Sequence, residues 1–459
     1  MPRRHHGGVT TNNDALPQPP LVEMVFLGTA SMVSSPTRHV AGIGVVIGGD
    51  CWIFDAGEGT GTQLAKSSVL QSAVSRVFVT HMHGDHVFGL MGLLLSVGST
   101  GDPRIIQVVG PPGLRRFLRR NLADTQSNMK CQYRVDELCF EQAKDEDALY
   151  LPLETQGLNV LPCADGTWRV PPSPSTIKQH QHRHPHDDDD NSSPMEEPFH
   201  VCAAALKHTL EPCYAFVIQE RDYPGRVHLT NECKARLLHD DNQAFLKARG
   251  VANPLSVLSR LQHGHAVELA DGILAPDDVV TERRIGRRLA ILGDTCDSRA
   301  VARLAVGADV VVHECTNAFV ESLDGGGHTS SEQVEAATYV HGHSTPRTAG
   351  RFAQAIQCRH LILTHFSRRY KDDGSMEPVM DTIRRQCGAL YDAGKIECAH
   401  DLEAVTVKIP KEDRYTDTDQ AYKDAATAAD EAKAHAQAFF HAHESLLLQL
   451  SRRSRRLLE

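Results

Sequence analysis

Five short apolar runs in this sequence end in, or lead directly into, histidine and acidic residues. The runs are residues 76–80, 199–208, 289–292, 309–312 and 360–364, and the polar residues at their ends are His81, His83, Asp85, His86, His208, Asp294, His313, Glu314 and His365. Short runs of this kind, rich in β-branched residues, are typical of strands buried on both faces in α/β proteins. Because ligands bind beyond the carboxyl ends of such strands, we expect these side chains to meet at one sheet edge.

The densest part of this pattern is Thr80-His81-Met82-His83-Gly84-Asp85-His86. His81 and His83 are two residues apart in an extended chain and point the same way, whereas Gly84 permits a turn after which Asp85 and His86 face a second point. Imidazole and carboxylate are ligands that Zn²⁺ or a similar ion takes in catalytic sites. A solvated loop is the alternative in a chain with 26 histidines, but the apolar residues 87–90 that follow favour a site for two metal ions.

The candidate ligands divide between two ions by ligand type. His81, His83 and His208 would hold one ion, Asp85, His86 and His365 the other, and Asp294 could bridge them. Two ions ~3.5 to 4 Å apart can ionise a water and clamp the oxygens of a phosphodiester during in-line displacement. The leaving oxygen also needs a proton, which a histidine oriented by a carboxylate would supply. We therefore expect a hydrolase.

Charge, aromatic content and cysteine spacing limit the kinds of partner and the cellular compartment that we expect. The net charge of −10 and pI near 6.2 argue against a generally basic nucleic-acid coat, and 5% aromatic residues disfavour a base-stacking platform. A nucleic acid would be held by its backbone and shape. The 12 cysteines are scattered without a CxxC pair, and no apolar signal or membrane-spanning run is present. These features predict a soluble protein of a reducing compartment, with no membrane partner.

The terminal segments carry basic residues whose role the sequence leaves open. Residues 1–20 are expected to be a disordered lead-in, with a mitochondrial presequence as the alternative. Cytoplasm or nucleus is therefore the expected location, and the mitochondrion stays open. Residues 412–459 predict a C-terminal helical extension that ends in four arginines at 452–456. That cluster could serve nuclear entry or RNA contact, although a solvated helix end is the simpler interpretation.

Three internal segments depart from the strand pattern. Residues 141–198 are acidic, proline-rich and histidine-rich at 180–186, which predicts a low-complexity insertion without fixed structure. Residues 221–282 are mixed in charge without an obvious core, which favours an arm. Residues 114–120 contain four arginines, Arg115, Arg116, Arg119 and Arg120. They could contact the phosphates of a nucleic acid or could simply form a solvated helix face.

Residues 81–90, His-Met-His-Gly-Asp-His-Val-Phe-Gly-Leu, resemble the signature of metallo-β-lactamase-fold hydrolases. Their Val-Phe-Gly-Leu ending resembles ribonuclease Z, the family of endonucleases that trim the 3′ end of precursor tRNA. Five other segments are similar to that family in order and neighbourhood, and they are residues 55–60 (DAGEGT), 110–113 (GPPG), 293–295 (GDT), 313–316 (HECT) and 363–370 (LTHFSRRY). The resemblance spans roughly residues 21–410.

This resemblance implies an α/β fold, a four-layer αβ/βα metallo-β-lactamase sandwich at residues 21–411 with a protruding arm at 221–282 that grips tRNA. It implies two Zn²⁺ ions per chain, with Mn²⁺ or Mg²⁺ as substitutes, and precursor tRNA as partner; a homodimer is left open. The expected products are a tRNA with a 3′-hydroxyl and a trailer with a 5′-phosphate. Residues 321–340, like 141–198, have no counterpart in the family and are expected to be a loop insertion.

The resemblance also implies roles for individual residues. Gly342-His343-Ser344-Thr345 is similar to the family's His-Ser-Thr motif, so His343 rather than His328 is the expected proton donor, paired with Glu314. Asp85, besides binding metal, is the expected general base. Ser31 and Arg38, in the first loop of the domain, are expected to contact substrate together with the four arginines at 115–120.

Two other functions fit part of the sequence. A metallo-β-lactamase-fold hydrolase of small phosphodiesters or thioesters would share every metal ligand, so only the arm and the arginine cluster favour RNA over it. A non-catalytic RNA-binding or scaffold protein could keep the same fold. The complete ligand set argues against this last alternative.

Overall fold

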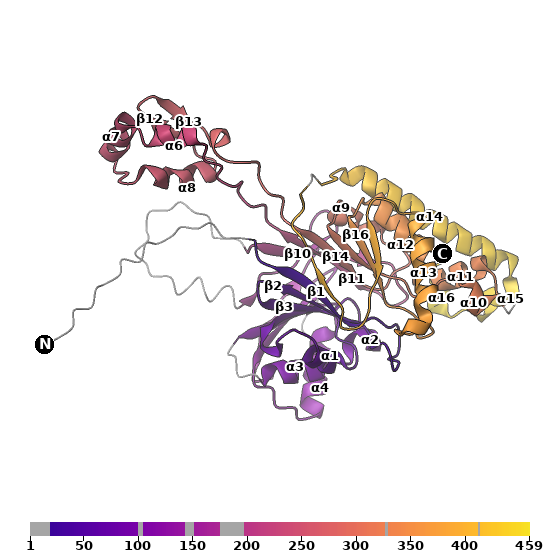
Figure 1. Ribbon diagram of the computed structural model, residues 1–459. Coiled ribbons are helices and arrows are strands. Elements are labelled where there is room, and N and C mark those ends of the chain that lie inside the picture. Colours follow the sequence, from indigo (N-terminus) through magenta and orange to yellow (C-terminus); the bar gives the residue numbers. More distant parts are fainter. Residues whose placement is uncertain (1–18, 100–103, 143–150, 175–196, 326–328, 412–413) are drawn as a thin grey trace. The chain divides into compact units, whose positions relative to one another are not determined.

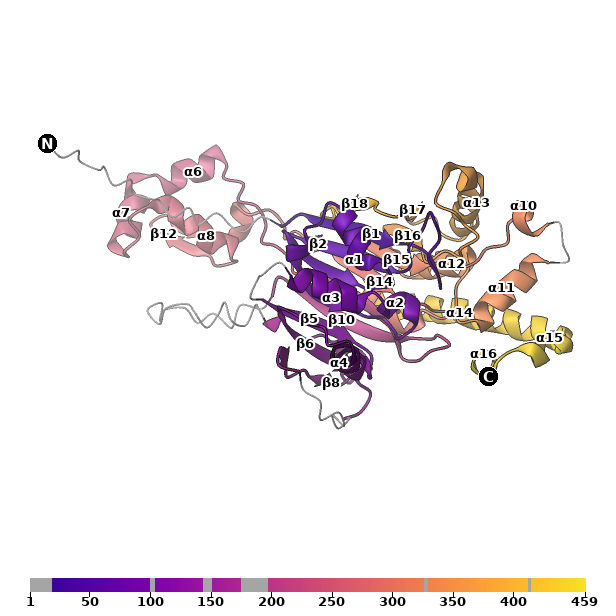
Figure 2. The same ribbon diagram turned by 90° about the horizontal axis from the view of Figure 1, so that it is seen from below.

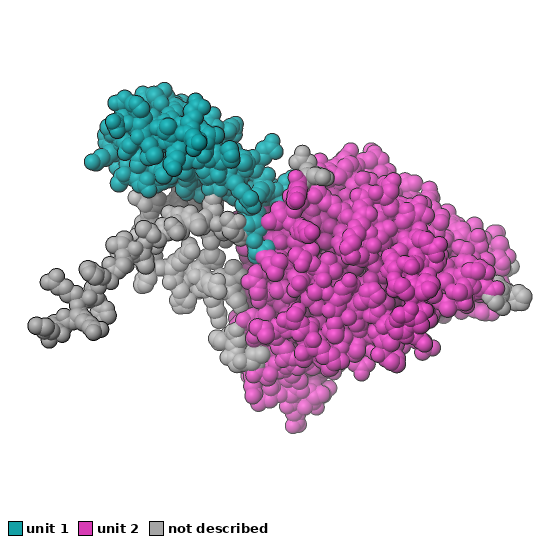
Figure 3. Space-filling model, in the orientation of Figure 1, with its two compact units in different colours: residues 1–20, 222–286 teal, residues 21–221, 287–459 magenta. Residues whose placement is uncertain are grey.

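The computed structural model describes residues 19–99, 104–142, 151–174, 197–325, 329–411 and 414–459 of the 459-residue chain. The chain divides into two compact units (Figure 3). We call the unit of residues 21–221 and 287–459 the body, and residues 222–286 of the other unit the arm. Most of the predicted lead-in, the histidine-rich tract at 180–186 and His328 lie outside the described residues.

The N-terminal half of the body, together with one strand from near residue 405, forms a nine-stranded sheet. Its strand order is β18 (Ala404–Thr406), β1 (Val22–Gly28), β2 (Gly42–Ile47), β3 (Asp50–Phe54), β4 (Val74–Phe78), β5 (Ile105–Gly110), β6 (Gln132–Leu138) and β7 (Glu154–Thr155), with β8 (Asn159–Val160) also paired to β6. Strands β3 to β6 are parallel. Helices α1 (Thr60–Lys66), α3 (Leu90–Gly98) and α4 (Leu114–Asp124) cover its outer face (Figure 2), where Leu64, Leu93 and Leu118 are fully buried.

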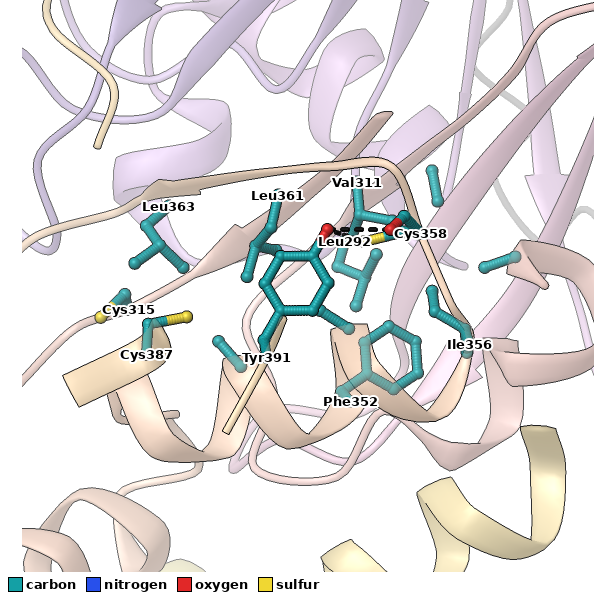
Figure 4. Close-up of a cluster of buried hydrophobic side chains, with 14 of the residues drawn as sticks. Leu292, Val311, Cys315, Phe352, Ile356, Cys358, Leu361, Leu363, Cys387 and Tyr391 are labelled. Atoms are coloured by element: carbon teal, nitrogen blue, oxygen red, sulfur yellow. Dashed lines mark hydrogen bonds between the residues drawn. The ribbon is translucent and has the colours of Figure 1, made fainter. Parts of the chain in front are cut away.

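The second half of the body forms a seven-stranded sheet. Its order is β17 (Lys395–Cys398), β16 (His360–Thr364), β15 (Val310–Glu314), β14 (Arg288–Leu292), β11 (Cys213–Glu220), β10 (Phe199–Leu206) and β9 (Trp168–Arg169). Strands β14 to β17 are parallel. Helices α9 (Ala302–Ala305), α12 (Pro346–Ala355), α13 (Glu377–Gly388) and α14 (Thr418–Ala442) pack on its outer face. Figure 4 shows part of this layer, where the buried Tyr391 hydroxyl donates to the carbonyl of Cys358 at 2.8 Å.

The two sheets pack face to face through an aromatic core. Phe54 stacks on Phe78 of the first sheet with ring centroids 4.6 Å apart, and Phe216 of the second sheet meets Phe78 edge-on at 5.2 Å. Trp168 is fully buried and meets Tyr214 edge-on at 5.2 Å. Large aromatic side chains in such contacts contribute strongly to core stability. Helices outside and sheets inside give the predicted four-layer αβ/βα architecture (Figure 1).

Two segments that the sequence predicts to be irregular contain regular structure. Residues 151–174 of the expected insertion at 141–198 supply β7 and β8 to the first sheet and β9 to the second. Residues 331–340 of the expected loop at 321–340 form helix α11 (Ser331–Val340), after the short α10 (Glu321–Asp324). Ser330 caps α11 by accepting a hydrogen bond from the Gln333 amide at 3.2 Å. In these segments, tertiary packing overrides the polar composition on which the expectation rested.

The arm has a small hydrophobic core, although the sequence suggested that it lacked one. It contains helices α6 (Asn231–Leu237), α7 (Asp240–Ala248) and α8 (Val257–Gln262) and a hairpin of β12 (Val267–Leu269) and β13 (Gly272–Leu274). Each element contributes only one or two buried apolar residues, and these are Leu237, Leu246, Val257, Leu261, Val267, Leu269 and Leu274, with Val279 beyond them. A core assembled from such scattered residues leaves no dense apolar run in the sequence.

The C-terminal extension is helical, as predicted, but it is not one helix. Helix α14 ends at Ala442, and α15 (Glu444–Gln449) and α16 (Arg452–Arg456) follow. The end of the chain then folds back on α14, where Lys433 donates from Nζ to the backbone oxygen of Glu459 at 2.8 Å. Within the described part of the chain, no helix combines the length and apolar character needed to cross a bilayer.

Candidate metal centre

The candidate ligands lie beyond the carboxyl ends of strands from both sheets. His81 and His83 follow β4 of the first sheet, and Asp85 and His86 lie in the four-residue helix α2 (Gly84–Val87). His208, Asp294 and His365 follow β10, β14 and β16 of the second sheet. The sequence suggested a single sheet edge. The structure instead places the side chains where the edges of two facing sheets meet, so that ligands converge from both sides.

The first group of ligands contains His81, His83, His208 and Asp294, each with a ligand atom within 4.8 Å of the others. His83 Nδ1 lies 3.0 Å from His81 Nε2 and 3.2 Å from His208 Nε2. Asp294 Oδ2 lies 3.7 Å from His81 Nε2. A tetrahedral Zn²⁺ with bonds of ~2.0 to 2.1 Å separates neighbouring ligand atoms by about 3.3 Å. The donor set and its spacing therefore fit a divalent cation.

The second group contains Asp85, His86 and His365. His365 Nε2 lies 3.2 Å from His86 Nε2 and 3.4 Å from Asp85 Oδ2. Asp294 reaches this group too, because its Oδ1 lies 3.4 Å from His365 Nε2 and its Oδ2 lies 3.4 Å from His86 Nε2. The Asp294 carboxylate thus lies between the two groups. All seven candidate ligands meet in the structure.

Hydrogen bonds on the far side of each ring fix which nitrogen faces the centre. A carboxylate or a carbonyl can only accept, so His86 donates from Nδ1 to Asp55 Oδ2 at 2.7 Å, and His208 donates from Nδ1 to the Gly342 carbonyl at 2.8 Å. The Thr80 hydroxyl donates to Asp55 at 2.9 Å and therefore accepts from His81 Nδ1 at 3.0 Å. In its neutral form, each of these three rings presents its Nε2 lone pair to the centre.

Glycine at position 342 permits this close packing. Gly342 has a φ of 79°, and a Cβ there would lie 2.7 Å from His208 Nδ1, so no other residue could keep the bond to His208 in place. Gly84 was expected to serve a turn. A Cβ there would lie 2.2 Å from the ring of Phe88, but that ring is exposed and could move aside, so Gly342 is the glycine that the packing requires.

Burial and charge set the protonation of the ligands. Burial lowers the pKa of His81 well below its usual value and that of His208 to about 4, so both rings are neutral and can act as ligands. Burial alone would raise the pKa of Asp294, but nearby His365 and His86 lower it well below its ordinary value. Burial would also lower the pKa of His86, yet Asp294 and Asp55 raise it well above normal. The negative charge of the buried carboxylates thus favours a positive charge nearby, which a bound cation would supply.

His343 lies beside the two groups and is held by a carboxylate. Its Nδ1 is 3.3 Å from Glu314 Oε1 and 3.9 Å from Asp294 Oδ2. Glu314 is fixed in turn by the amides of Ser344 and Thr316, at 2.6 and 2.9 Å. Burial would lower the pKa of His343, but Glu314, Asp294 and Asp85 raise it to about 9. His343 also lines a cavity of about 470 Å³ between α11, α12 and α14. It is therefore a protonated, oriented group with an open side.

His313, which the strand pattern also brought toward the site, is buried elsewhere. Its Nδ1 donates to the Glu314 carbonyl at 2.7 Å, and its Nε2 lies 2.9 Å from the Ser298 hydroxyl. Neighbouring residues of a strand point to opposite faces, so Glu314 faces the centre and His313 does not.

The arginines expected to contact substrate divide into two pairs. Arg115 and Arg119 are buried: Arg115 donates to the Val135 carbonyl at 3.1 Å, and Arg119 forms an ion pair of 2.8 Å with Glu154. These two guanidiniums hold α4 against the first sheet, which corrects the expectation that they meet RNA. Arg116 and Arg120 are exposed on the same helix.

The two expected contacts in the first loop are also buried. Arg38 is 1% exposed and donates to the Thr29 hydroxyl at 2.6 Å and to the Ala399 carbonyl at 2.9 Å, so it ties the loop to the body. Ser31 is 3% exposed, with its amide bonded to the Phe366 carbonyl at 2.9 Å. The geometry assigns Arg38 a structural role in place of the expected substrate contact.

Several residues that support the site were not singled out by sequence. The Met32 amide donates to Asp85 Oδ2 at 2.6 Å, while its side chain is 75% exposed beside the centre. The Thr316 hydroxyl lies 3.1 Å from His365 Nδ1 and 3.2 Å from His343 Nδ1. Single hydroxyls and amides leave no recognisable spacing. Asp55 lies in segment 55–60, whose acidic residues are expected to orient ligands, but its pairing with His86 was not predicted.

Comparison with known proteins agrees with this geometry. The family model described as Metallo-beta-lactamase superfamily matches residues 43–98. The zinc phosphodiesterase ELAC protein 1 of Bos taurus is 31% identical over 405 residues, covering 85% of this chain and 99% of the relative, and that of Homo sapiens is 31% identical over 415 residues. Ribonuclease Z of Microcystis aeruginosa is 29% identical over 393 residues, covering 85% of this chain and 97% of the relative.

A solved structure shares the fold. The crystal structure of the short form of human tRNase Z (ELAC1) covers 84% of this chain and all of its own, with a TM-score of 0.52 and 24% identity. The identity and near-complete coverage of the curated relatives decide the relationship. The chain belongs to the metallo-β-lactamase-fold family that comprises ribonuclease Z and the ELAC protein 1 zinc phosphodiesterases.

Proposed function

We propose that this protein is a zinc-dependent endoribonuclease that removes the 3′ trailer of precursor tRNA and leaves a 3′-hydroxyl on the tRNA. The observation that carries the proposal is the convergence of seven ligand side chains in two groups, with Asp294 of the first group also 3.4 Å from His86 and from His365 of the second. Phosphodiester hydrolysis is the reaction that such a paired arrangement serves. The names of the relatives, zinc phosphodiesterase and ribonuclease Z, support the same reaction.

We infer that the two groups hold two divalent cations, Zn²⁺ by preference and Mn²⁺ or Mg²⁺ as substitutes. Imidazoles outnumber carboxylates in the donor set, which favours Zn²⁺ over harder ions. When bound, the cations would supply Lewis acidity toward the phosphate oxygens and the attacking water. Asp55 and the Gly342 carbonyl hold His86 and His208 in the tautomer that such binding requires.

Two of the chain's own groups would move protons. Asp85 is the proposed general base. Burial would raise its pKa, but the hydrogen bond from His365 and the charge of His86 lower it, so the carboxylate is ionised at neutral pH. His343 is the proposed general acid, because Glu314 keeps it protonated and oriented while its open side faces a cavity. It would donate a proton to the 3′ oxygen that leaves with the tRNA.

Residues that are not metal ligands would grip the RNA. The arm is a compact unit with its own core and is therefore suited to act as a rigid contact with the tRNA. Arg116 and Arg120, exposed on α4, are the proposed contacts with phosphate. Backbone contacts of this kind position the RNA without reading its sequence.

The test is to incubate the purified protein with a 3′-extended tRNA transcript and to map the product ends. We expect a tRNA ending in a 3′-hydroxyl and a trailer beginning with a 5′-phosphate. Cleavage at random positions, or no cleavage by metal-loaded protein, would reject the proposal. Deleting residues 225–275 should abolish this cleavage and spare a small chromogenic phosphodiester. Equal loss of both activities would favour a hydrolase of small phosphodiesters or thioesters.

The proposal extends to compartment and assembly. All twelve cysteines are free, which suits a reducing compartment, so we assign the protein to the cytoplasm or nucleus, with the mitochondrion as the third location. Fractionation of cells that express the tagged protein tests this assignment. Light scattering on the purified protein would distinguish a homodimer from a monomer.

A further inference from the structure

The C-terminal extension packs on the two segments that lead to the proton donor and to the shared ligand. Leu457, beyond α16, and Phe440 of α14 belong to one buried cluster with Cys296, which follows Asp294 closely in the chain, and with Tyr339 and Val340 at the end of α11. The segment from 341 to 343 then leads directly to His343. Figures 1 and 2 both show α16 beside α11. The last turn of the chain is thus held on the His343 side of the metal centre.

Helix α16 is fixed in place although it is short. Ser451 caps it by accepting from the Ser454 amide at 3.2 Å, and Ser454 itself is only 4% exposed. Leu457 is 3% exposed in the cluster described above. The Glu459 backbone oxygen accepts from Lys433 of α14 at 2.8 Å. The side chains of α16 therefore project from an ordered surface, so binding through them requires little further ordering of the backbone.

Three arginines of α16 are exposed. They are Arg452, Arg453 and Arg456, and no residue that the structure describes forms an ion pair with them. Arginines on the neighbouring helices do have acidic partners, as in the pairs Arg299–Asp430 at 2.6 Å and Arg351–Glu431 at 3.3 Å. We call Arg452, Arg453 and Arg456 the α16 arginine patch. It concentrates positive charge on a protein whose net charge is −10.

We propose that the α16 arginine patch binds backbone phosphates of the acceptor stem of the tRNA substrate. Planar guanidinium groups match the geometry of phosphate oxygens. The choice of the acceptor stem over the trailer rests on the proposed function. His343 protonates the oxygen that stays with the tRNA, so the surface beyond His343, which includes α11 and α16, lies on the tRNA side of the scissile bond. The contact carries no sequence preference and serves every tRNA alike.

The test compares two triple variants in the full-length protein. Arg452, Arg453 and Arg456 are replaced together by alanine in one and by lysine in the other, and KM and kcat are measured on a 3′-extended tRNA. With alanine we expect KM to rise about ten-fold at moderate salt and kcat to stay within about two-fold, because the patch acts in ground-state binding. Lysine keeps the charge and should restore most of the affinity.

Binding of mature tRNA, measured by fluorescence anisotropy over a range of salt concentrations, locates the contact. The alanine variant should show a salt dependence shallower by about one unit of slope for each phosphate that the patch no longer neutralises. Its affinity for a free trailer oligonucleotide should match that of the wild type. A charge-matched control replaces the exposed Lys66, Lys130 and Lys408 by alanine and should leave KM unchanged.

Four results would overturn the inference. The first is an alanine variant with unchanged KM and unchanged salt dependence, and the second is a lysine variant that loses as much affinity for tRNA as the alanine variant. The third is an alanine variant that binds only the trailer oligonucleotide more weakly. The fourth is an alanine variant that has a wild-type KM but is no longer imported into the nucleus. The last would make the patch a targeting signal. If the wild-type protein itself fails to cleave the extended tRNA, the proposed function fails. If the wild type cleaves and the alanine variant equals it, only this inference fails.

Discussion

The two ligand groups of the metal centre differ in how their histidines are supported. In the first group, neutral partners hold the far side of the rings: the Thr80 hydroxyl at 3.0 Å from His81 and the Gly342 carbonyl at 2.8 Å from His208. In the second group, a carboxylate supports one of the two rings, because Asp55 accepts from His86 at 2.7 Å, whereas the Thr316 hydroxyl lies 3.1 Å from Nδ1 of the other ring, His365. The second group also has a carboxylate ligand of its own, Asp85.

This difference predicts unequal affinities for metal. A carboxylate behind a ligating imidazole raises its basicity, and a second negative charge in a buried site attracts a cation more strongly. The second group should therefore bind its cation more tightly. The first group, with three neutral rings and a half-buried His83, should release its cation first. Asp294 links the two and makes each depend on the other.

The largest effect is expected from Asp294→Ala, because this change removes the ligand that both groups share. The rate of phosphodiester cleavage should fall by more than the ~10² to 10⁴-fold expected for loss of a general acid alone. Steady-state assays with a small phosphodiester and with precursor tRNA measure the decrease. If the variant kept near-normal activity on both substrates, the two groups would not share a ligand, and their comparison as a linked pair would fail.

His343→Ala tests whether His343 belongs to either group. Its ring lies close enough to Asp294 and His365 to form a third potential metal group. As a proton donor, it should leave metal content unchanged while cleavage slows ~10² to 10⁴-fold. Metal analysis and single-turnover rates separate the two roles. His328→Ala is the matched control and should have little effect, whereas a loss of bound metal in His343→Ala would assign the residue as a ligand.

Asp55→Asn should weaken metal binding at the second group in particular. Removing the charge behind His86 is expected to cost 10- to 100-fold in affinity, the approximate range for such supporting partners. Thr80→Val is the matched change behind His81. It also removes a hydrogen bond to Asp55, but it leaves every charge in place, so its effect should be smaller. Titration of apoprotein against a competing chelator measures both, and equal losses of affinity would remove the predicted asymmetry.

The smallest expected change is a shift in the pH profile. His343 donates a proton only below its pKa, which its carboxylate neighbours raise to about 9, so kcat should fall as pH rises toward that value. Bound cations would offset the negative charge of Asp294 and Asp85, so the pKa of His343 and the pH at which kcat falls would both be lower. Glu314→Gln removes the leading source of the increase in pKa and should lower that pH still further. An unchanged pH would show that another group controls the rate at high pH.

The ligands could be predicted because each follows a recognisable strand. Short buried strands and the residues at their ends are local features of the sequence. Sorting the seven candidate ligands by residue type then gave the two groups that meet in space. Their supports could not be predicted in the same way. Asp55 lies 2.7 Å from His86 only because two strands bring separate loops together, and the Thr316 hydroxyl leaves no pattern.

Other misses have different physical causes. On α4, Leu114, Leu118 and Leu122 form the buried stripe, and Arg115 and Arg119 lie beside it, so helical periodicity could have distinguished them from the exposed Arg116 and Arg120. Composition could not reveal the core of the arm or the strands in residues 151–174. Those segments bury a few apolar residues each, and only their packing partners make them regular.

The most direct test of the account is a count of metal ions per chain by elemental analysis of purified protein, with His208→Ala and His365→Ala as matched variants. The account predicts about two ions in the wild type and about one in each variant, with the more tightly held ion retained in His208→Ala. One ion or fewer in the wild type, or loss of the same ion from both variants, would contradict two cation sites joined through Asp294.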